Sequence, residues 1–352
     1  MAPPIRVALL GYGLAGAAFH APLIAAVDGL ELAAIVTRSE ERRSRARAEH
    51  PGAVLLDSAD DVWKRAGELD LVVVASPNRF HIPLASAAVA AGLAVVVDKP
   101  LAASAGEAGA LVREAHRRSV LLTVFQNRRW DGDFLTIRRL LETAQLGTVA
   151  RFESRFERWR PALSGGWRES GDPADAGGLL YDLGSHLVDQ ALQLFGPAAE
   201  VYAELDARRP AVRTDDDTFV ALTHESGVRS HLWMSAVAAE QGPRFRVLGS
   251  EAAFTKYGLD VQEEALRDGG DPREPGWGHE PAEHWGELVT GDETRRIKTV
   301  PGAYQRFYEG VVAALHDGAH PPVDPDQVVA ALEVLDAARL AARERRVVTF
   351  LD

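Results

Sequence analysis

A glycine-rich turn close to the N-terminus has the greatest bearing on how this chain can fold. The apolar run Ile5–Leu10 leads directly into the turn, and a helix-forming stretch follows at 15–27. The turn has the sequence Gly11-Tyr12-Gly13-Leu14-Ala15-Gly16, a G-x-G-x-x-G pattern. Between a strand and a helix, the first glycine permits a tight turn, the second lets a pyrophosphate approach the backbone, and the third lets strand and helix pack closely. N–H groups at the start of the helix then bind the phosphates, so these six residues predict a dinucleotide-binding fold.

The first third of the chain alternates short apolar runs with helix-forming stretches. The runs lie at 5–10, 32–37, 53–56, 70–75, 94–97 and 120–124, and the helical stretches include 15–27, 40–49, 80–91 and 104–117. The runs are almost wholly apolar, as strands covered on both faces should be. This alternation predicts a parallel sheet with helices on both faces. Together with the glycine turn it indicates an α/β, Rossmann-type domain, which we place at 1–127.

The pattern changes after about Asn127. Strand-like runs follow at 149–158, 200–205, 217–224, 228–235, 245–248 and 347–351, with helical stretches at 133–143, 178–194, 304–317 and 325–345. Several consecutive strands after a strand–helix repeat predict a second, α+β domain. We place this domain at 128–352 and expect it to be built on a large, mostly antiparallel open sheet.

Composition and charge limit the partners of the chain. Acidic residues outnumber basic ones, 51 to 39, for a net charge of −12, whereas nucleic-acid binding needs a clustered basic surface. There is no cysteine, so a disulfide, a thiolate nucleophile or a cysteine-ligated metal is impossible. The uncharged stretch 7–27 is interrupted by glycines and Pro22, unlike a membrane span. We therefore expect a soluble cytoplasmic protein with no nucleic-acid or membrane partner.

A metal site is not expected either. His279 and His284 superficially resemble the two histidines of a zinc-binding helix, but they stand five residues apart and Pro281 lies between them. Two ligands on one helical face would require a spacing of four and an unbroken helix.

The end of the second predicted strand indicates which nucleotide binds. An NAD-dependent fold usually places Asp or Glu there to accept a hydrogen bond from the ribose 2′-hydroxyl. Here the residues are Thr37, Arg38 and Ser39, so no carboxylate repels a 2′-phosphate. Arg38 can pair with that phosphate, and the two hydroxyls can donate to it. The sequence predicts NADP(H) rather than NAD(H); the alternative is that Arg38 is a solvated surface charge.

Four motifs together give the chain a resemblance to a known family. They are the turn at 11–16, Ser76-Pro77-Asn78-Arg79-Phe80-His81, Asp98-Lys99-Pro100, and Asp182-Leu183-Gly184-Ser185-His186. Over nearly its whole length the chain resembles the glucose–fructose oxidoreductase / inositol dehydrogenase family, often called Gfo/Idh/MocA. The family usually has Glu-Lys-Pro where this chain has Asp-Lys-Pro, which is shorter by one methylene and keeps the charge.

Within that family the chain most resembles the NADP-dependent scyllo-inositol dehydrogenases. The motifs behind this narrower resemblance include Phe19-His20-Ala21-Pro22-Leu23, Asn127-Arg128-Arg129-Trp130-Asp131, Trp167-Arg168-Glu169 and Gly276-Trp277-Gly278.

The resemblance implies a catalytic trio of Lys99, Asp182 and His186. Lys99 follows a predicted strand at its carboxyl end, where open α/β sheets bind ligands. Asp182 and His186 are four residues apart on a predicted helix, so both project from one face. Oxidising an alcohol requires a group that takes the hydroxyl proton, a task that suits histidine or a lysine with a lowered pKa. Either Lys99 or His186 can be this acid/base, while Asp182 would orient one of them and balance its charge.

The resemblance also implies further residues around the ligands. On the cofactor side it implies Ser76, Pro77, Asn78, His81, Asp98, Lys99, Gln126, Asn127, Trp167 and Arg168, and on the substrate side Lys99, Tyr181, Asp182 and His186. Some of these residues also fit other roles. His81 can make a local bond at a helix start, Trp167 and Arg168 can serve packing, and Tyr181 can be a core tyrosine.

The expected function is NADP(H)-dependent hydride transfer between nicotinamide and a cyclic polyol or sugar of the scyllo-inositol or inosose type. The enzyme alternative is a related sugar or aldose reductase. The alternative from another class is a non-catalytic NADP-binding regulator, against which the presence of Lys99 and His186 speaks. The resemblance implies that the protein is a homodimer or homotetramer.

Cofactor affinities test the charge argument at Arg38. We expect the unaltered protein to bind NADPH more tightly than NADH, and Arg38→Ala to weaken NADPH binding by about tenfold, the value of one charged hydrogen bond. NADH binding should change little, because NADH has no 2′-phosphate. Fluorescence titration measures both dissociation constants, and equal affinities in the unaltered protein would contradict the prediction.

Overall fold

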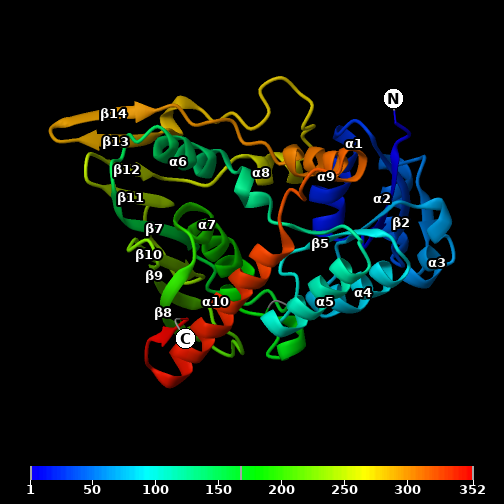
Figure 1. The fold of residues 1–352 in the computed structure, drawn as a ribbon, viewed down its shortest axis with the longest axis horizontal. Coiled ribbons are helices and arrows are strands. Elements are labelled where there is room, and N and C mark those ends of the chain that lie inside the picture. The colour runs from blue at the N-terminus through cyan, green and yellow to red at the C-terminus, as the bar shows by residue number, and fades with distance from the viewer. Residues whose placement is uncertain (1, 167–168, 351–352) are drawn as a thin grey trace. The chain divides into compact units, whose positions relative to one another are not determined.

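The computed structural model describes residues 2–166 and 169–350. The chain forms two compact units (Figure 1). The first comprises Met1–Asn127, Gln262–Trp277 and Ala303–Val329, and the second Arg128–Val261, Gly278–Gly302 and Ala330–Asp352. Segments 262–277 and 303–329 therefore pack with the first unit, although they fall in the range 128–352 predicted for the second domain. The boundaries 1–127 and 128–352 stay a prediction.

A six-stranded parallel sheet forms the centre of the first unit. Its strands are β1 (Ile5–Leu10), β2 (Leu30–Val36), β3 (Val54–Leu56), β4 (Leu71–Val74), β5 (Ala94–Asp98) and β6 (Leu122–Phe125). Their spatial order is β3-β2-β1-β4-β5-β6, with every pairing parallel. This is the strand order of the Rossmann fold, and it reverses between β1 and β4, where such sheets bind their ligands. The predicted Rossmann sheet is confirmed.

Helices cover this sheet because its strands are apolar on both faces; all four residues of β4, for example, are buried. They are η1 (Ala15–His20), α1 (Ala21–Ala26), α2 (Glu40–Glu49), α3 (Ala59–Trp63), η2 (Ala66–Glu68), η3 (Asn78–Phe80), α4 (His81–Ala90), α5 (Ala105–Arg117), α8 (Gln262–Arg267) and α9 (Gln305–Asp317). Helix α4 packs beside α5, and α1 packs beside α9, which comes from the late part of the chain (Figure 1).

A nine-stranded sheet forms the second unit. Its strands are β7 (Val149–Glu157), β8 (Ala198–Asp206), β9 (Asp217–His224), β10 (Arg229–Ser235), β11 (Phe245–Gly249), β12 (Ala253–Lys256), β13 (Gly286–Thr290), β14 (Glu293–Ile297) and β15 (Val348–Thr349). Their order is β14-β13-β12-β11-β7-β10-β9-β8-β15, and every pairing is antiparallel except β7 with β10. The predicted large, mostly antiparallel sheet is confirmed. Along β9 the buried and half-buried side chains alternate, so one face carries the core.

Helix α7 (Ser185–Phe195) packs against β7 and β10 and continues directly from the π-helix η7 (Leu180–Gly184). Besides α8 and α9, the described chain after residue 126 contains the helical elements η4 (Asn127–Trp130), α6 (Gly132–Glu142), η6 (Pro173–Asp175), η8 (Ala282–His284) and α10 (Pro325–Glu344). In the described part of the chain, no helix has the length and hydropathy that a bilayer crossing needs.

Buried polar contacts fix α7 in place. Arg129 on η4 donates two hydrogen bonds to Asp189, from Nε to Oδ2 over 2.9 Å and from Nη2 to Oδ1 over 2.6 Å. The next residue, Gln190, donates to the backbone carbonyl of Arg128 and accepts from Nη2 of Arg244, each over 2.9 Å. All five residues are buried. Because these contacts form at two consecutive helix positions, they set both the rotation and the height of α7.

The contacts of Arg129 with Asp189 and of Gln190 with Arg128 and Arg244 are called the clamp below. Removing one charge of the clamp should destabilise the second unit. Asp189→Asn removes the carboxylate charge that faces the buried Arg129 guanidinium, so we expect the free energy of unfolding to fall by about 3 kcal/mol or more. Urea denaturation followed by circular dichroism measures the change. The control is Glu142→Gln, which breaks an exposed pair with Arg138 at 3.8 Å and should cost less than about 1 kcal/mol. Equal losses in the two variants would contradict the role given to the clamp.

Candidate active site

The three glycines of the turn after β1 differ in their surroundings. Two of them lie too close to backbone atoms to carry a side chain, and one faces open space. Gly11 has φ +108°, and a Cβ added to it would lie 2.4 Å from the carbonyl oxygen of Ala75. A Cβ on Gly16 would lie 2.0 Å from the carbonyl oxygen of Gly11. A Cβ on Gly13 would meet nothing nearer than Nη1 of Arg42, at 3.9 Å. Backbone atoms therefore fill the space beside Gly11 and Gly16, whereas the space beside Gly13 is open. A dinucleotide's pyrophosphate requires such an open space.

The other residues of the turn act mainly through their backbone. The Tyr12 side chain is buried and its hydroxyl donates to Oε2 of Glu49 over 2.6 Å, while burial raises the pKa of Tyr12. The side chain of Leu14 is half exposed, and η1 begins at Ala15. The first N–H groups of η1 thus start at the turn, where a helix N-terminus favours anions.

Arginines gather at the carboxyl end of β2. Arg43 donates from Nη1 to Oδ1 of Asp57 over 2.7 Å and to the carbonyl of the buried Thr37 over 3.1 Å. Arg38 donates from Nε to the carbonyl of Asp57 over 3.1 Å, so its other guanidinium nitrogens remain available. Neither Arg38 nor Arg42 has a carboxylate partner within the part of the chain that the structure describes. Two guanidinium groups without a carboxylate partner among the described residues therefore lie near the end of β2, while Arg43 is paired with Glu40 and Asp57.

Ser39 has a second task besides its predicted contact with the nucleotide. Its side-chain oxygen accepts from the backbone N–H of Arg42 over 3.4 Å and so caps α2. The cap fixes where α2 starts, and with it the direction from which Arg42 reaches toward Gly13.

The loops after β4 and β5 are joined by His81. Its Nδ1 lies 2.7 Å from the carbonyl oxygen of Pro100, and its Nε2 lies 2.8 Å from that of Ser76. The side chain is buried at the start of α4. The local role considered for His81 is thus present, and it ties the loop of Ser76, Pro77 and Asn78 to the Lys99–Pro100 turn.

Lys99 stands directly after β5, at the carboxyl edge of the sheet. Its backbone N–H donates to Oδ1 of Asp98 over 2.8 Å, and its peptide bond to Pro100 is cis. Behind Asp98 lies His20, which is fully buried, with Nδ1 2.7 Å from the Tyr308 hydroxyl. Burial lowers the pKa of His20 to about 4. The negative charge of Asp98, whose Oδ1 lies 3.9 Å from Nε2 of His20, raises this pKa but has the smaller effect. His20 is therefore neutral at pH 7, and sequence reasoning gave it no role beyond its place in a motif.

Gln126 follows β6 and is buried, yet its Oε1 has no hydrogen-bond partner among residues 2–166 and 169–350. A buried acceptor without a partner is costly, which favours a ligand donor at this position. Together with the open face at Gly13, it shows that the first unit has the features that a bound dinucleotide needs. Asn127 lies next along the chain, where η4 begins.

Asp182 and His186 lie on the continuous helix formed by η7 and α7 in the second unit. Asp182 lines a cavity of about 110 Å³ together with Arg158, Arg160 and Ser235. His186 is buried in the first turn of α7, three residues before the clamped Asp189. The clamp therefore also orients the helix that carries these two residues. The predicted residues Trp167 and Arg168 lie outside the described residues.

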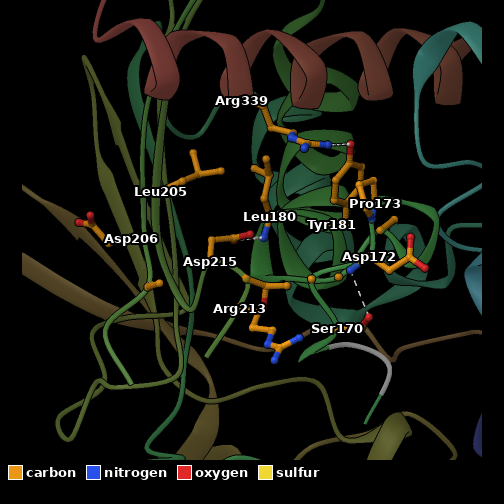
Figure 2. Close-up of a pocket in the computed structure, with 15 residues that line it drawn as sticks. Ser170, Asp172, Pro173, Leu180, Tyr181, Leu205, Asp206, Arg213, Asp215 and Arg339 are labelled. Carbon is orange, nitrogen blue, oxygen red and sulfur yellow. Dashed lines mark hydrogen bonds between the residues drawn. The ribbon is translucent and has the colours of Figure 1, made fainter. Parts of the chain in front are cut away.

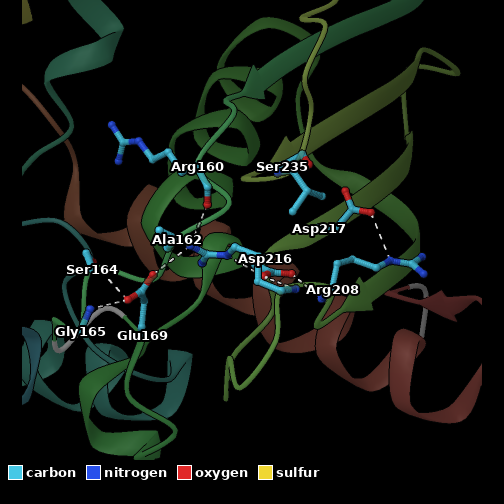
Figure 3. A network of polar contacts seen from close by, with 11 residues as sticks. Arg160, Ala162, Ser164, Gly165, Glu169, Arg208, Asp216, Asp217 and Ser235 are labelled. Carbon is cyan, nitrogen blue, oxygen red and sulfur yellow. Dashed lines mark hydrogen bonds and ion pairs between the residues drawn. The ribbon is translucent and has the colours of Figure 1, made fainter.

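Figure 3 shows an ion network that contains Arg160, Ala162 and Glu169, three of the residues that line the Asp182 cavity. The buried Arg209 donates from Nε to Oδ2 of Asp216 over 2.8 Å and lies 3.0 Å from Oε1 of Glu169. It also donates to the backbone carbonyls of Arg160 and Ala162. The Arg209 guanidinium thus connects the segments that carry Asp216 and Arg160–Ala162. It lies between the carboxylates of Asp216 and Glu169.

Tyr181 lines a different and larger cavity, of about 340 Å³ (Figure 2). Its hydroxyl accepts from Nη1 of Arg339 over 3.0 Å. Consecutive residues of η7 therefore face two cavities, since Asp182 lines the smaller one. Asp215 lines both cavities, and its carboxylate accepts from the N–H of Leu180 and the hydroxyl of Thr218, each over 2.7 Å. The role predicted for Tyr181 in binding substrate stays a prediction.

No group of three His, Asp or Glu side chains in the described ranges is placed to hold a metal ion. His279 and His284 are accordingly not brought into such a group.

Comparison with known proteins gives two family matches. Residues 5–126 match the family described as "Oxidoreductase family, NAD-binding Rossmann fold", and residues 138–350 match "Oxidoreductase family, C-terminal alpha/beta domain", both of Gfo/Idh/MocA. The NADP⁺-dependent scyllo-inositol 2-dehydrogenase IolW of Bacillus subtilis is 34% identical, with 98% of this chain and 95% of that protein covered. The uncharacterized oxidoreductase YdgJ of Escherichia coli is 38% identical, with 98% of each chain covered. The solved structure of YvaA from Bacillus subtilis superposes with a TM-score of 0.94 at 34% identity, over 99% of each chain.

Two glycine variants separate the packing role of the turn from its ligand-binding role. Gly16→Ala places a methyl group against a carbonyl oxygen, so we expect the Tm without nucleotide to fall by about 5 °C or more. Gly13→Ala should leave this Tm nearly unchanged and weaken NADPH binding by about tenfold or more, because its methyl group occupies the space of the pyrophosphate. Thermal unfolding and fluorescence titration provide the two readouts. Nucleotide affinity unaffected by Gly13→Ala would mean that the dinucleotide does not bind at this turn.

Proposed function

The chain belongs to the Gfo/Idh/MocA oxidoreductase family, and we propose that it transfers a hydride between NADP(H) and a CH–OH carbon of a cyclic polyol or sugar. The substrate class that we propose is that of scyllo-inositol and the corresponding inososes. The observation that carries the proposal is the glycine turn, closed at Gly11 and Gly16 and open at Gly13, in a sheet that also presents Lys99 at its carboxyl edge.

The guanidinium groups near the end of β2 support NADP(H) over NAD(H). Arg38 and Arg42 have no carboxylate partner in the described ranges, and the strand end itself carries no Asp or Glu. A 2′-phosphate would meet these guanidinium groups, which bind phosphate oxygens with charged hydrogen bonds. A relative at 34% identity that is named for its use of NADP⁺ points the same way.

In the proposed mechanism, bound NADP(H) would supply the hydride acceptor or donor. Lys99, at the end of β5, would stand next to that nucleotide, because its turn with Asp98 and Pro100 and the contact of His81 with Pro100 hold it at the carboxyl edge of the sheet. Asp182 and His186 would contact the substrate, and they lie on a helix whose rotation the Arg129–Asp189 pair fixes. During oxidation of the alcohol, the C–H bond gives up the hydride and the hydroxyl proton passes to Lys99 or His186. During reduction the same group returns the proton to the oxygen, and Asp182 balances the charge.

We further propose that the protein works in the cytoplasm as a homodimer or homotetramer. Its lack of cysteine fits a reducing compartment, and the family resemblance supports the assembly.

Two variants test the proposed acid–base groups. Lys99→Ala and His186→Ala should each lower kcat with NADP⁺ and scyllo-inositol by about 10²-fold, the usual contribution of a positioned acid or base. Nicotinamide absorbance at a saturating level of both substrates measures the rate. The matched control is Lys64→Ala, which removes an exposed lysine paired with Asp61 and should leave kcat unchanged.

Near-normal turnover in both variants would contradict the assignment of these groups. An unaltered protein that binds NADPH but oxidises no inositol and no aldose would instead favour the non-catalytic regulator.

A further inference from the structure

The 340 Å³ cavity of the second unit is lined by none of the proposed catalytic residues Lys99, Asp182 and His186. Leu180 and Tyr181 line it, whereas Asp182 and Leu183, the next residues of η7, line the smaller cavity (Figure 2). Its size falls in the range of small-molecule sites, whose volumes begin at about 300 Å³. The two cavities meet only at Thr214 and Asp215 among their described lining residues. The larger one is therefore a separate chamber next to the cavity that Asp182 lines.

The charges around this chamber nearly cancel. Two guanidinium groups, of Arg213 and Arg339, face three carboxyl groups, of Asp172, Asp206 and Asp215. One carboxylate, Asp206, is already paired with Arg208 outside the chamber. This leaves the guanidinium groups of Arg213 and Arg339 against the carboxyl groups of Asp172 and Asp215. The chamber consequently has no strong field that would select an anion or a cation.

The polar groups nevertheless supply both donors and acceptors at close spacing. Arg339 donates to the Tyr181 hydroxyl, so a guanidinium and a phenol hydroxyl stand together in the wall. Ser170 and Thr214 add hydroxyls that serve in either direction. A ligand with several vicinal hydroxyls matches such a mixture, because each of its hydroxyls both donates and accepts.

The remaining side chains of the lining are apolar. They are those of Pro173, Ala176, Leu180, Leu205 and Ala207. These apolar side chains lie among the polar groups, with Leu180 between Arg339 and Asp215 and Pro173 beside Tyr181 (Figure 2). Such a mixed lining suits a ligand that presents both C–H groups and hydroxyls. A saturated ring that carries hydroxyl groups presents both.

We propose that this chamber is a second ligand site, which binds an uncharged polyhydroxylated ring compound, a sugar or a cyclitol. The site is distinct from the one at Asp182, and it does not require that the protein oxidise the compound bound there. Because Asp215 forms part of both walls and accepts from the N–H of Leu180, the two sites share one structural element at the start of η7.

Counting bound polyol tests the proposal on the NADPH complex. NADPH cannot oxidise a polyol, so the complex binds without turnover. Equilibrium dialysis against radiolabelled myo-inositol at millimolar concentration should find two molecules per chain. Leu205→Trp fills the chamber from β8 and should leave one. The control is Glu204→Trp, which places the same side chain at the exposed preceding position and should leave two.

Arg339→Ala provides a milder variant in case Leu205→Trp does not fold. It removes one guanidinium donor from the chamber wall, so we expect the second dissociation constant to rise by about tenfold. One polyol per chain in the unaltered protein, or two that persist in Leu205→Trp, would overturn the proposal. Displacement of the second polyol by millimolar inorganic phosphate would also overturn it, since the chamber would then be an anion site.

This test and that of the reaction can fail independently. Oxidation of inositol by a protein that binds only one polyol would reject the second site and keep the proposed function. Two bound polyols on a protein without polyol oxidation would reject the function and keep the site.

Discussion

The close approach of Gly16 to the carbonyl of Gly11 is the constraint on which the rest of the first unit rests. With no Cβ at either position, η1 begins directly above the end of β1, and its first N–H groups lie at the switch point of the sheet. Gly13 then remains as the open position between them. Any side chain at Gly11 or Gly16 would push the helix away from the strand and spread the donors that a pyrophosphate needs. The positions of Lys99, Gln126 and the arginines after β2 matter only because this approach fixes where the ligand can lie.

A comparable constraint operates in the second unit, but it consists of buried ions instead of glycines. The Arg129–Asp189 pair and the contacts of Gln190 hold α7 at two consecutive positions. Buried ion pairs add little net stability, but they penalise every arrangement that separates them. That penalty holds the helix that carries Asp182 and His186 in one orientation. The motif that contains Arg128 and Arg129 thereby acquires a physical role that the sequence alone did not suggest.

Much of this architecture was predictable from local patterns. The nearly unbroken apolar runs predicted the parallel strands, and the glycine spacing predicted the phosphate-binding turn at 11–16. Both predictions depend on residues that are close in sequence. Strands β13 and β14 were not foreseen. They lie toward one edge of the large sheet, and the residues of β14, from Glu293 to Ile297, are too polar to show apolar periodicity. The packing of 262–277 and 303–329 with the first unit was equally hidden, because it depends on contacts between distant segments.

The candidate site shows the same division. Motifs located Lys99, Asp182 and His186, but nothing local revealed that Tyr181 and Asp182 face different cavities or that His81 joins two loops. Those facts depend on the π-helical turn at η7 and on carbonyl groups brought together by the tertiary fold.

Isotope transfer tests the central claim most directly. Scyllo-inositol that carries deuterium on its ring carbons, incubated with the protein and NADP⁺, should yield NADPH with one deuterium at nicotinamide C4, detected by mass spectrometry. Reduced nucleotide without deuterium, or no reduced nucleotide with any polyol or sugar offered, would contradict hydride transfer between a CH–OH carbon and the nicotinamide.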